Sequence, residues 1–188
     1  MFGRKFAFIA ASAVALIALG LCPALSRPWK PTPTAIIRDY ATISDSRPGS
    51  ELILLLWFVP QMVPSDSAGS GIAAAMLQKY IVILAVHGHL ESTSGTMSFE
   101  DLDGLKAEDE TGKPLTPVAR DDLPPTNIAM LAAMEGVIRQ SFGAMGKGMK
   151  MFVFGAGGVD SCKKGQLSVP FASETYTWDT PFPGCPQK

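Results

Sequence analysis

Hydrophobic and polar positions divide the chain into short segments with distinct patterns. An unbroken apolar run over 52–59 (LILLLWFV), followed by two nearby prolines, predicts a strand buried on both faces. The segment 80–91 (YIVILAVHGHLE) is rich in Ile and Val and predicts a second strand. A turn-like stretch separates it from 96–100, where apolar and polar residues alternate. A short helical turn is predicted over 72–77, between the two strands.

The clearest helical pattern follows two consecutive prolines at 124–125. Thr126 or Asn127 can cap this helix, because either side chain accepts a hydrogen bond from the first turn. Apolar residues then recur every three or four positions, at Ile128, Leu131, Met134, Ile138, Phe142 and Met145. Glycines between 143 and 148 end the pattern.

Shorter strands are predicted over 115–118 and 151–154 and in the tail, where alternate apolar residues share a face. Short strands at roughly regular spacing with one crossover α-helix predict a mainly β domain, of the β-sandwich or immunoglobulin-like type, over 35–188. The alternative is an α+β domain. The layout resembles secreted bacterial immunoglobulin-like modules in outline, and this resemblance implies a fold and no function.

Residues 1–26 have the pattern of a secretory signal peptide. Two basic residues precede an uncharged, mostly apolar stretch over 6–22, and small residues then suit a cleavage site after position 26. An uncleaved membrane anchor is the alternative, because the apolar stretch is near the lower limit for a bilayer span. A proline-rich spacer is predicted over 27–34. We therefore expect an extracytoplasmic protein, either periplasmic or secreted.

Composition narrows the possible functions. The 188 residues carry 16 Lys and Arg against 17 Asp and Glu, a balance that offers no basic field to a nucleic-acid backbone. With 47% hydrophobic and 18% charged residues, the chain is too apolar for a disordered protein. Beyond the signal segment only Cys162 and Cys185 remain, and in an oxidising compartment this pair predicts a structural disulfide.

The end of the segment 80–91 carries the most informative chemistry. Because side chains alternate along a strand, His87, His89 and Glu91 share one face. Two imidazoles and a carboxylate are suitable ligands for zinc or copper, and the methionines of the chain would add thioether ligands for copper. The alternative is that the strand leaves the core here, so that these side chains meet water, while the methionines fill the core.

Three aromatic residues lie close to the predicted disulfide. Tyr176, Trp178 and Phe182 belong to a tail that Cys185 and several prolines would hold in place. Aromatic side chains held in this way can form a surface that recognises a partner. The alternative, which we favour, is that they close the open end of the domain.

The sequence thus favours a non-catalytic binding or envelope-structural domain. No cofactor is expected beyond a possible transition metal, and the partner would be an envelope protein or a small ligand, with membrane contact only through an uncleaved N-terminal segment. A periplasmic metal-binding protein using His87 and His89 is the first alternative. A hydrolase with paired carboxylates is the second, with candidates at Asp101, Asp103, Glu108 and Asp109.

Overall fold

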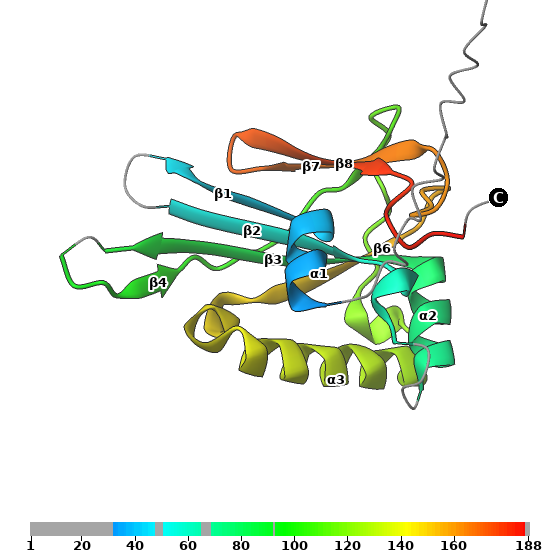
Figure 1. Cartoon of the computed structure of the whole chain (residues 1–188), viewed down its shortest axis with the longest axis horizontal. Coiled ribbons are helices and arrows are strands. Elements are labelled where there is room, and N and C mark those ends of the chain that lie inside the picture. Colours follow the sequence, from blue (N-terminus) through cyan, green and yellow to red (C-terminus); the bar gives the residue numbers. More distant parts are fainter. Residues whose placement is uncertain (1–31, 48–50, 65–68, 92, 187–188) are drawn as a thin grey trace, which may run out of the picture.

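The computed structural model describes residues 32–47, 51–64, 69–91 and 93–186 (Figure 1). The predicted signal segment 1–26 and the greater part of the spacer lie outside the described residues. None of the helices in the described part of the chain has the length and apolar character needed to cross a bilayer.

The helices and strands follow one another in a fixed order. They are α1 (Pro33–Tyr40), β1 (Ala41–Arg47), β2 (Glu51–Phe58), α2 (Ser70–Lys79), β3 (Tyr80–Leu90), β4 (Met97–Phe99), β5 (Glu108–Asp109), α3 (Pro125–Ser141), β6 (Lys150–Gly155), β7 (Gly165–Phe171) and β8 (Glu174–Thr180). Short 3₁₀ turns occur at Pro60–Met62, Arg120–Asp122 and Gly143–Gly148.

The strands form two antiparallel sheets. In the larger, five-stranded sheet the order is β1-β2-β3, and β3 then pairs along its length with two different strands. Its first half, Tyr80 to Ala85, pairs with β6, and its last residues, Gly88 to Leu90, pair with β4. The smaller sheet has the order β5-β7-β8. The long strand β3 is therefore the centre of the fold.

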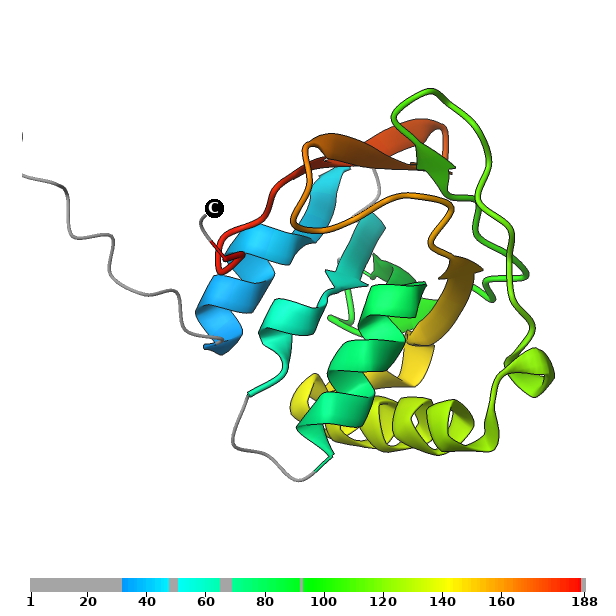
Figure 2. The ribbon, with the colours of Figure 1, turned by 90° about the vertical axis from the view of Figure 1, so that its right-hand side faces the viewer.

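The β7–β8 hairpin lies over one face of the large sheet, and α2 and α3 lie on the other side (Figures 1 and 2). Trp57 of β2 contacts the hairpin at Trp178, with ring centroids 6.3 Å apart, and the tail at Phe182, at 5.1 Å. Tyr40 adds a third contact, because its ring lies 4.6 Å from that of Phe182. These aromatic rings join the large sheet to the C-terminal hairpin.

The tail aromatics are consequently core residues. Tyr176, Trp178 and Phe182 are only 5%, 5% and 6% exposed. The partner-recognition surface suggested by the sequence is therefore not formed by these side chains. They close the domain from inside, because the hairpin that carries two of them folds back on the large sheet instead of projecting from it.

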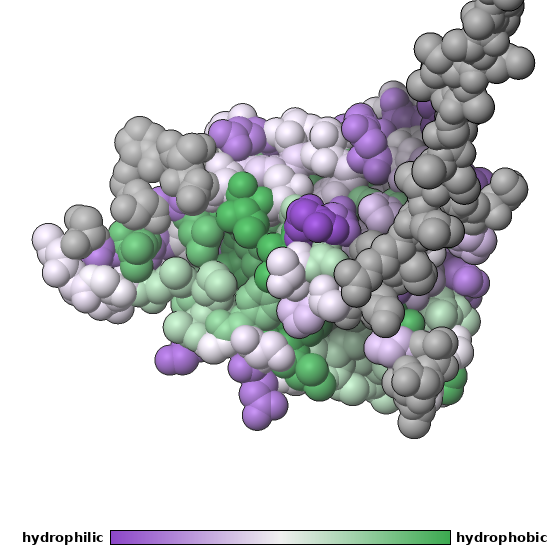
Figure 3. Space-filling view, viewed as in Figure 1, coloured by the Kyte–Doolittle hydropathy of each residue, from purple (hydrophilic) through white to green (hydrophobic). Residues whose placement is uncertain are grey.

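The helices leave part of their side of the large sheet uncovered. Ile43 of β1 and Leu90 of β3 project from the face opposite His87 and are 51% and 41% exposed. Figure 3 shows this apolar area beside α1, where Ile37 is also 40% exposed.

The fold agrees with the coarser prediction only. A β-rich, antiparallel domain is present, but the described residues contain three α-helices where one was predicted, so the α+β alternative describes it better. A β-sandwich or immunoglobulin-like arrangement is not confirmed, because helices cover one side of the large sheet and the second sheet has three strands.

Helix α1 replaces the end of the predicted spacer. Thr32 caps it, its Oγ1 accepting a hydrogen bond from the Ala35 amide at 3.3 Å. Pro33 follows at the first helical position, where a missing N–H group is tolerated. A proline-rich composition therefore concealed a helix start, because the position of each proline matters more than their number.

The individual element predictions have mixed outcomes. The strands over 52–59 and 80–91 are confirmed as β2 and β3, and the predicted helix is confirmed as α3. The predicted strand over 115–118 is wrong. Pro114 and Pro117 form only isolated bridges there, because proline has no N–H group to donate to a continuing ladder.

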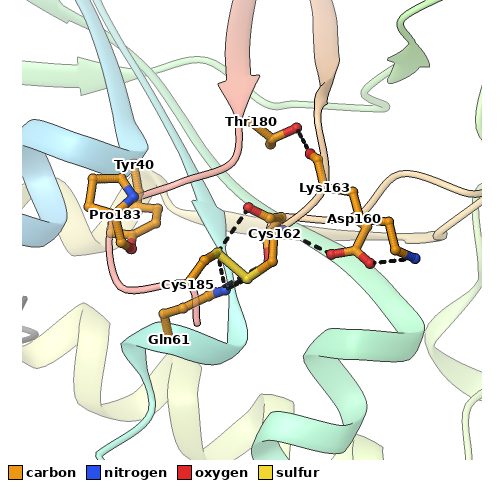
Figure 4. The surroundings of a disulfide bond; sticks show 9 residues. Tyr40, Gln61, Asp160, Cys162, Lys163, Thr180, Pro183 and Cys185 are labelled. Atoms are coloured by element: carbon orange, nitrogen blue, oxygen red, sulfur yellow. Dashed lines mark hydrogen bonds and ion pairs between the residues drawn. A yellow bond between two sulfur atoms is a disulfide. The ribbon is translucent and has the colours of Figure 1, made fainter. Parts of the chain in front are cut away.

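The predicted disulfide between Cys162 and Cys185 is formed, with the two Cα atoms 5.4 Å apart. It joins the loop after β6 to the C-terminal tail (Figure 4). The amide of Gln61 lies against the bridge, with Nε2 3.0 Å from Cys185 Sγ and 3.2 Å from Ser161 Oγ. The bridge thus holds the tail beside the end of β2.

The turn between β7 and β8 offers a stability test. Its central residues, Ala172 and Ser173, have φ angles of 48° and 69°, a conformation that L-residues with a Cβ adopt at a cost of about 1 kcal/mol or more each. Asn-Gly is the preferred pair for such two-residue hairpin turns. We expect the double variant Ala172→Asn/Ser173→Gly to raise the melting temperature by about 2–4 °C, measured by circular dichroism. An unchanged or lower melting temperature would contradict this account of the turn.

Candidate metal centre

His87 and His89 lie on the same face of β3, on the side that the β7–β8 hairpin covers. The register between β2 and β3 places Glu51 opposite His89 and Ile53 opposite His87. Residues directly opposite in an antiparallel pair project to the same face of the sheet. The first residue of β2 therefore brings a carboxylate to the two imidazoles.

Glu51 contacts the more deeply placed histidine. Its Oε1 lies 2.5 Å from Nε2 of His87, and the two side chains are only 15% and 9% exposed. A carboxylate and an imidazole at this depth form a strong pair, because little water competes for either group.

Glu100 approaches the same histidines from the other side. The β3–β4 hairpin pairs Gly88 with Phe99, so Glu100 follows opposite His87, and its N–H donates to the His87 carbonyl at 3.0 Å. Its Oε2 lies 2.8 Å from Nδ1 of His87, and its Oε1 lies 2.8 Å from Nε2 of His89. One carboxylate therefore bridges both rings.

Ring contacts complete the surroundings of His87. The centroids of the His87 and His89 rings are 5.3 Å apart. Phe171, at the end of β7, places its ring edge-on to His87 with a centroid distance of 5.4 Å. The hairpin thus shields the inner imidazole from water, and His87 is 7% exposed.

Glu51, His87 and His89 together have the geometry of a possible metal site. One ligand atom from each lies within 4.8 Å of the others. Two imidazole nitrogens and a carboxylate oxygen suit Zn²⁺ or Cu²⁺. The sequence-based expectation named Glu91 as the carboxylate, but Glu91 follows β3 in an exposed turn, where it accepts a hydrogen bond from Ser94 Oγ at 2.8 Å.

The methionines considered as copper ligands lie elsewhere. Met151 pairs with Leu84, which projects from the face of β3 opposite His87. Met149 is buried, at 3% exposure, in the apolar core. The donor atoms gathered around the two histidines in the described residues are nitrogen and oxygen, which favours zinc or Cu²⁺ over Cu⁺.

The carboxylates considered for a hydrolase are engaged separately. Lys150 donates a hydrogen bond to Asp101 and lowers the pKa of that carboxyl group. Thr111 Oγ1 donates to Asp109 at 2.7 Å, and this bond lowers the pKa of Asp109. A carboxyl group with a lowered pKa is ionised at neutral pH and is poorly suited to act as a general acid. Asp103 is exposed and Glu108 half-buried, and neither belongs to the His87 cluster.

No known protein family, curated protein or solved structure matches this chain.

Proposed function

We propose that this is an extracytoplasmic protein that binds a transition metal, with Zn²⁺ or Cu²⁺ held by Glu51, His87 and His89. One observation carries the proposal. Three donor groups from two strands converge to within 4.8 Å at the covered end of the large sheet. The predicted signal segment and the Cys162–Cys185 bridge support a location outside the cytoplasm.

Charge also supports a cation at this position. Two carboxylates, from Glu51 and Glu100, contact the buried His87. A divalent ion would balance their negative charge where water supplies little screening. The small exposure of His87 favours retention of an ion over turnover of a substrate, in keeping with the expectation of a non-catalytic binding domain.

Removing the imidazoles is the first test. The metal-free protein is expected to bind one Zn²⁺ or Cu²⁺ per chain, measured by native mass spectrometry and isothermal titration calorimetry. The His87→Ala/His89→Ala variant is expected to lose the ion, because a single carboxylate remains of the three donors. Glu91→Gln is the matched control and is expected to bind as the wild type does. A wild-type chain that binds neither metal would overturn the proposal.

Folding is controlled with a second variant. Replacement of the buried His87 disturbs its packing against Phe171, whereas the side chain of His89 is 38% exposed. His89→Ala alone is therefore expected to fold and still to bind the metal far more weakly. Equal affinity of this variant and the wild type would contradict the proposed ligand set.

A further inference from the structure

Glu100 contacts the candidate ligands without belonging to the three-donor group. Glu51 approaches His87 at Nε2, and Glu100 approaches the same ring at Nδ1. These nitrogens lie on different sides of the imidazole, so a metal held beside Glu51 would leave Nδ1 free for Glu100. At His89, Glu100 occupies Nε2.

The chemistry of a carboxylate decides what this contact does. An ionised carboxylate only accepts hydrogen bonds, so each ring nitrogen bonded to it carries the proton. A neutral imidazole has one such proton, and its other nitrogen keeps a lone pair for a metal. The hydrogen bonds from Glu100 would therefore leave Nε2 of His87 and Nδ1 of His89 as the metal-binding atoms.

We infer that Glu100 is the positioning residue of the metal site, a single carboxylate that orients both imidazoles from behind and selects the nitrogen that each presents to the ion. The inference rests on the proposed metal-binding function. Carboxylates that hold metal-ligating histidines in this way usually contribute about 10- to 100-fold to affinity.

The hairpin holds Glu100 in place before any ion arrives. Its backbone N–H is bonded to the His87 carbonyl, and the preceding Phe99 packs on Gly88. A Cβ at Gly88 would lie 3.3 Å from the Phe99 ring and 3.2 Å from the Ser98 carbonyl, so a glycine between the histidines allows β4 to approach closely. The carboxylate is thus delivered by a packed strand.

Glu100→Gln tests the inference by affinity. The amide offers one acceptor and one donor, so it can replace the carboxylate at one ring and not at both. We expect the variant to bind Zn²⁺ about 10- to 100-fold more weakly than the wild type in competition with a chelating dye. Glu91→Gln makes the same chemical change in the same hairpin and is expected to leave the affinity unchanged. Because the Glu100 side chain is 51% exposed, the metal-free variant is expected to melt as the wild type does.

Nuclear magnetic resonance gives a readout that a purely structural role would not change. The chain has two histidines, so long-range ¹H–¹⁵N spectra of histidine-labelled protein resolve both rings. With Zn²⁺ bound, we expect the metal at Nε2 of His87 and at Nδ1 of His89. In Glu100→Gln, one ring is expected to lose this pattern.

The outcomes separate the two proposals. A wild-type protein that binds no Zn²⁺ overturns the metal-binding function and the role of Glu100 with it. Zn²⁺ binding by the wild type with unchanged affinity in Glu100→Gln overturns the role of Glu100 alone. Binding through Nδ1 of His87 or Nε2 of His89 has the same consequence for Glu100.

Discussion

Replacing Trp178 by alanine is expected to lower the free energy of unfolding by about 3–5 kcal/mol. The side chain is 5% exposed and packs against Trp57, so its removal leaves a cavity between the two sheets. Its Nε1 also donates to the Tyr40 carbonyl at 2.9 Å, a buried bond whose loss leaves an unsatisfied acceptor.

Urea unfolding followed by far-ultraviolet circular dichroism measures this loss without depending on tryptophan fluorescence. Trp178→Phe is the matched variant, because it keeps an aromatic ring and removes the Nε1–H donor. It is expected to lose about 1–3 kcal/mol. A loss below about 1 kcal/mol for the alanine variant would contradict a central packing role.

Removal of the disulfide has the second largest expected effect on stability. The bridge joins residues 23 positions apart. Closing a loop of this length restricts the unfolded chain and stabilises the folded state by about 3 kcal/mol. We expect the Cys162→Ser/Cys185→Ser variant to unfold at a correspondingly lower denaturant concentration.

The control for this experiment is the reductant itself. Wild-type protein in the presence of a reducing agent is expected to approach the stability of the double variant, while the variant is unaffected by reduction. Equal stability of the oxidised wild type and the variant would contradict the prediction. A triple variant that adds Trp178→Ala is expected to be non-additive, because the tail that Cys185 anchors also carries Phe182 into the same aromatic cluster.

The elements that the sequence predicted well are those whose local pattern agrees with their final environment. The run 52–59 is apolar throughout because β2 is covered on both faces. The segment 80–91 became the longest strand for the same reason. Helix α3 kept its apolar periodicity because only one side of it meets the sheet.

The elements that were missed lack such a pattern. Helix α1 has eight residues, preceded and begun by proline-containing sequence, and β1 follows it without a break. Neither shows a long apolar period, and both depend on contacts with β2 that neighbouring residues in the sequence do not encode. Their formation is a tertiary effect.

The candidate site shows the same division. Strand alternation placed His87 and His89 on one face, and pairing 96–100 with the end of 80–91 as a hairpin would have placed Glu100 opposite His87. Glu91 was the wrong neighbour to expect in the donor group, because the strand ends at Leu90 and the chain turns away.

Local pattern by itself determined the two buried strands, the long helix, the cysteine pair and the shared face of the histidines, since each depends on residues a few positions apart or on a single possible partner. The tertiary structure alone decided that Glu51 meets His87 and that the tail aromatics are buried. Both depend on the register between strands far apart in the chain. That register is set by how whole apolar faces pack, which no short segment specifies.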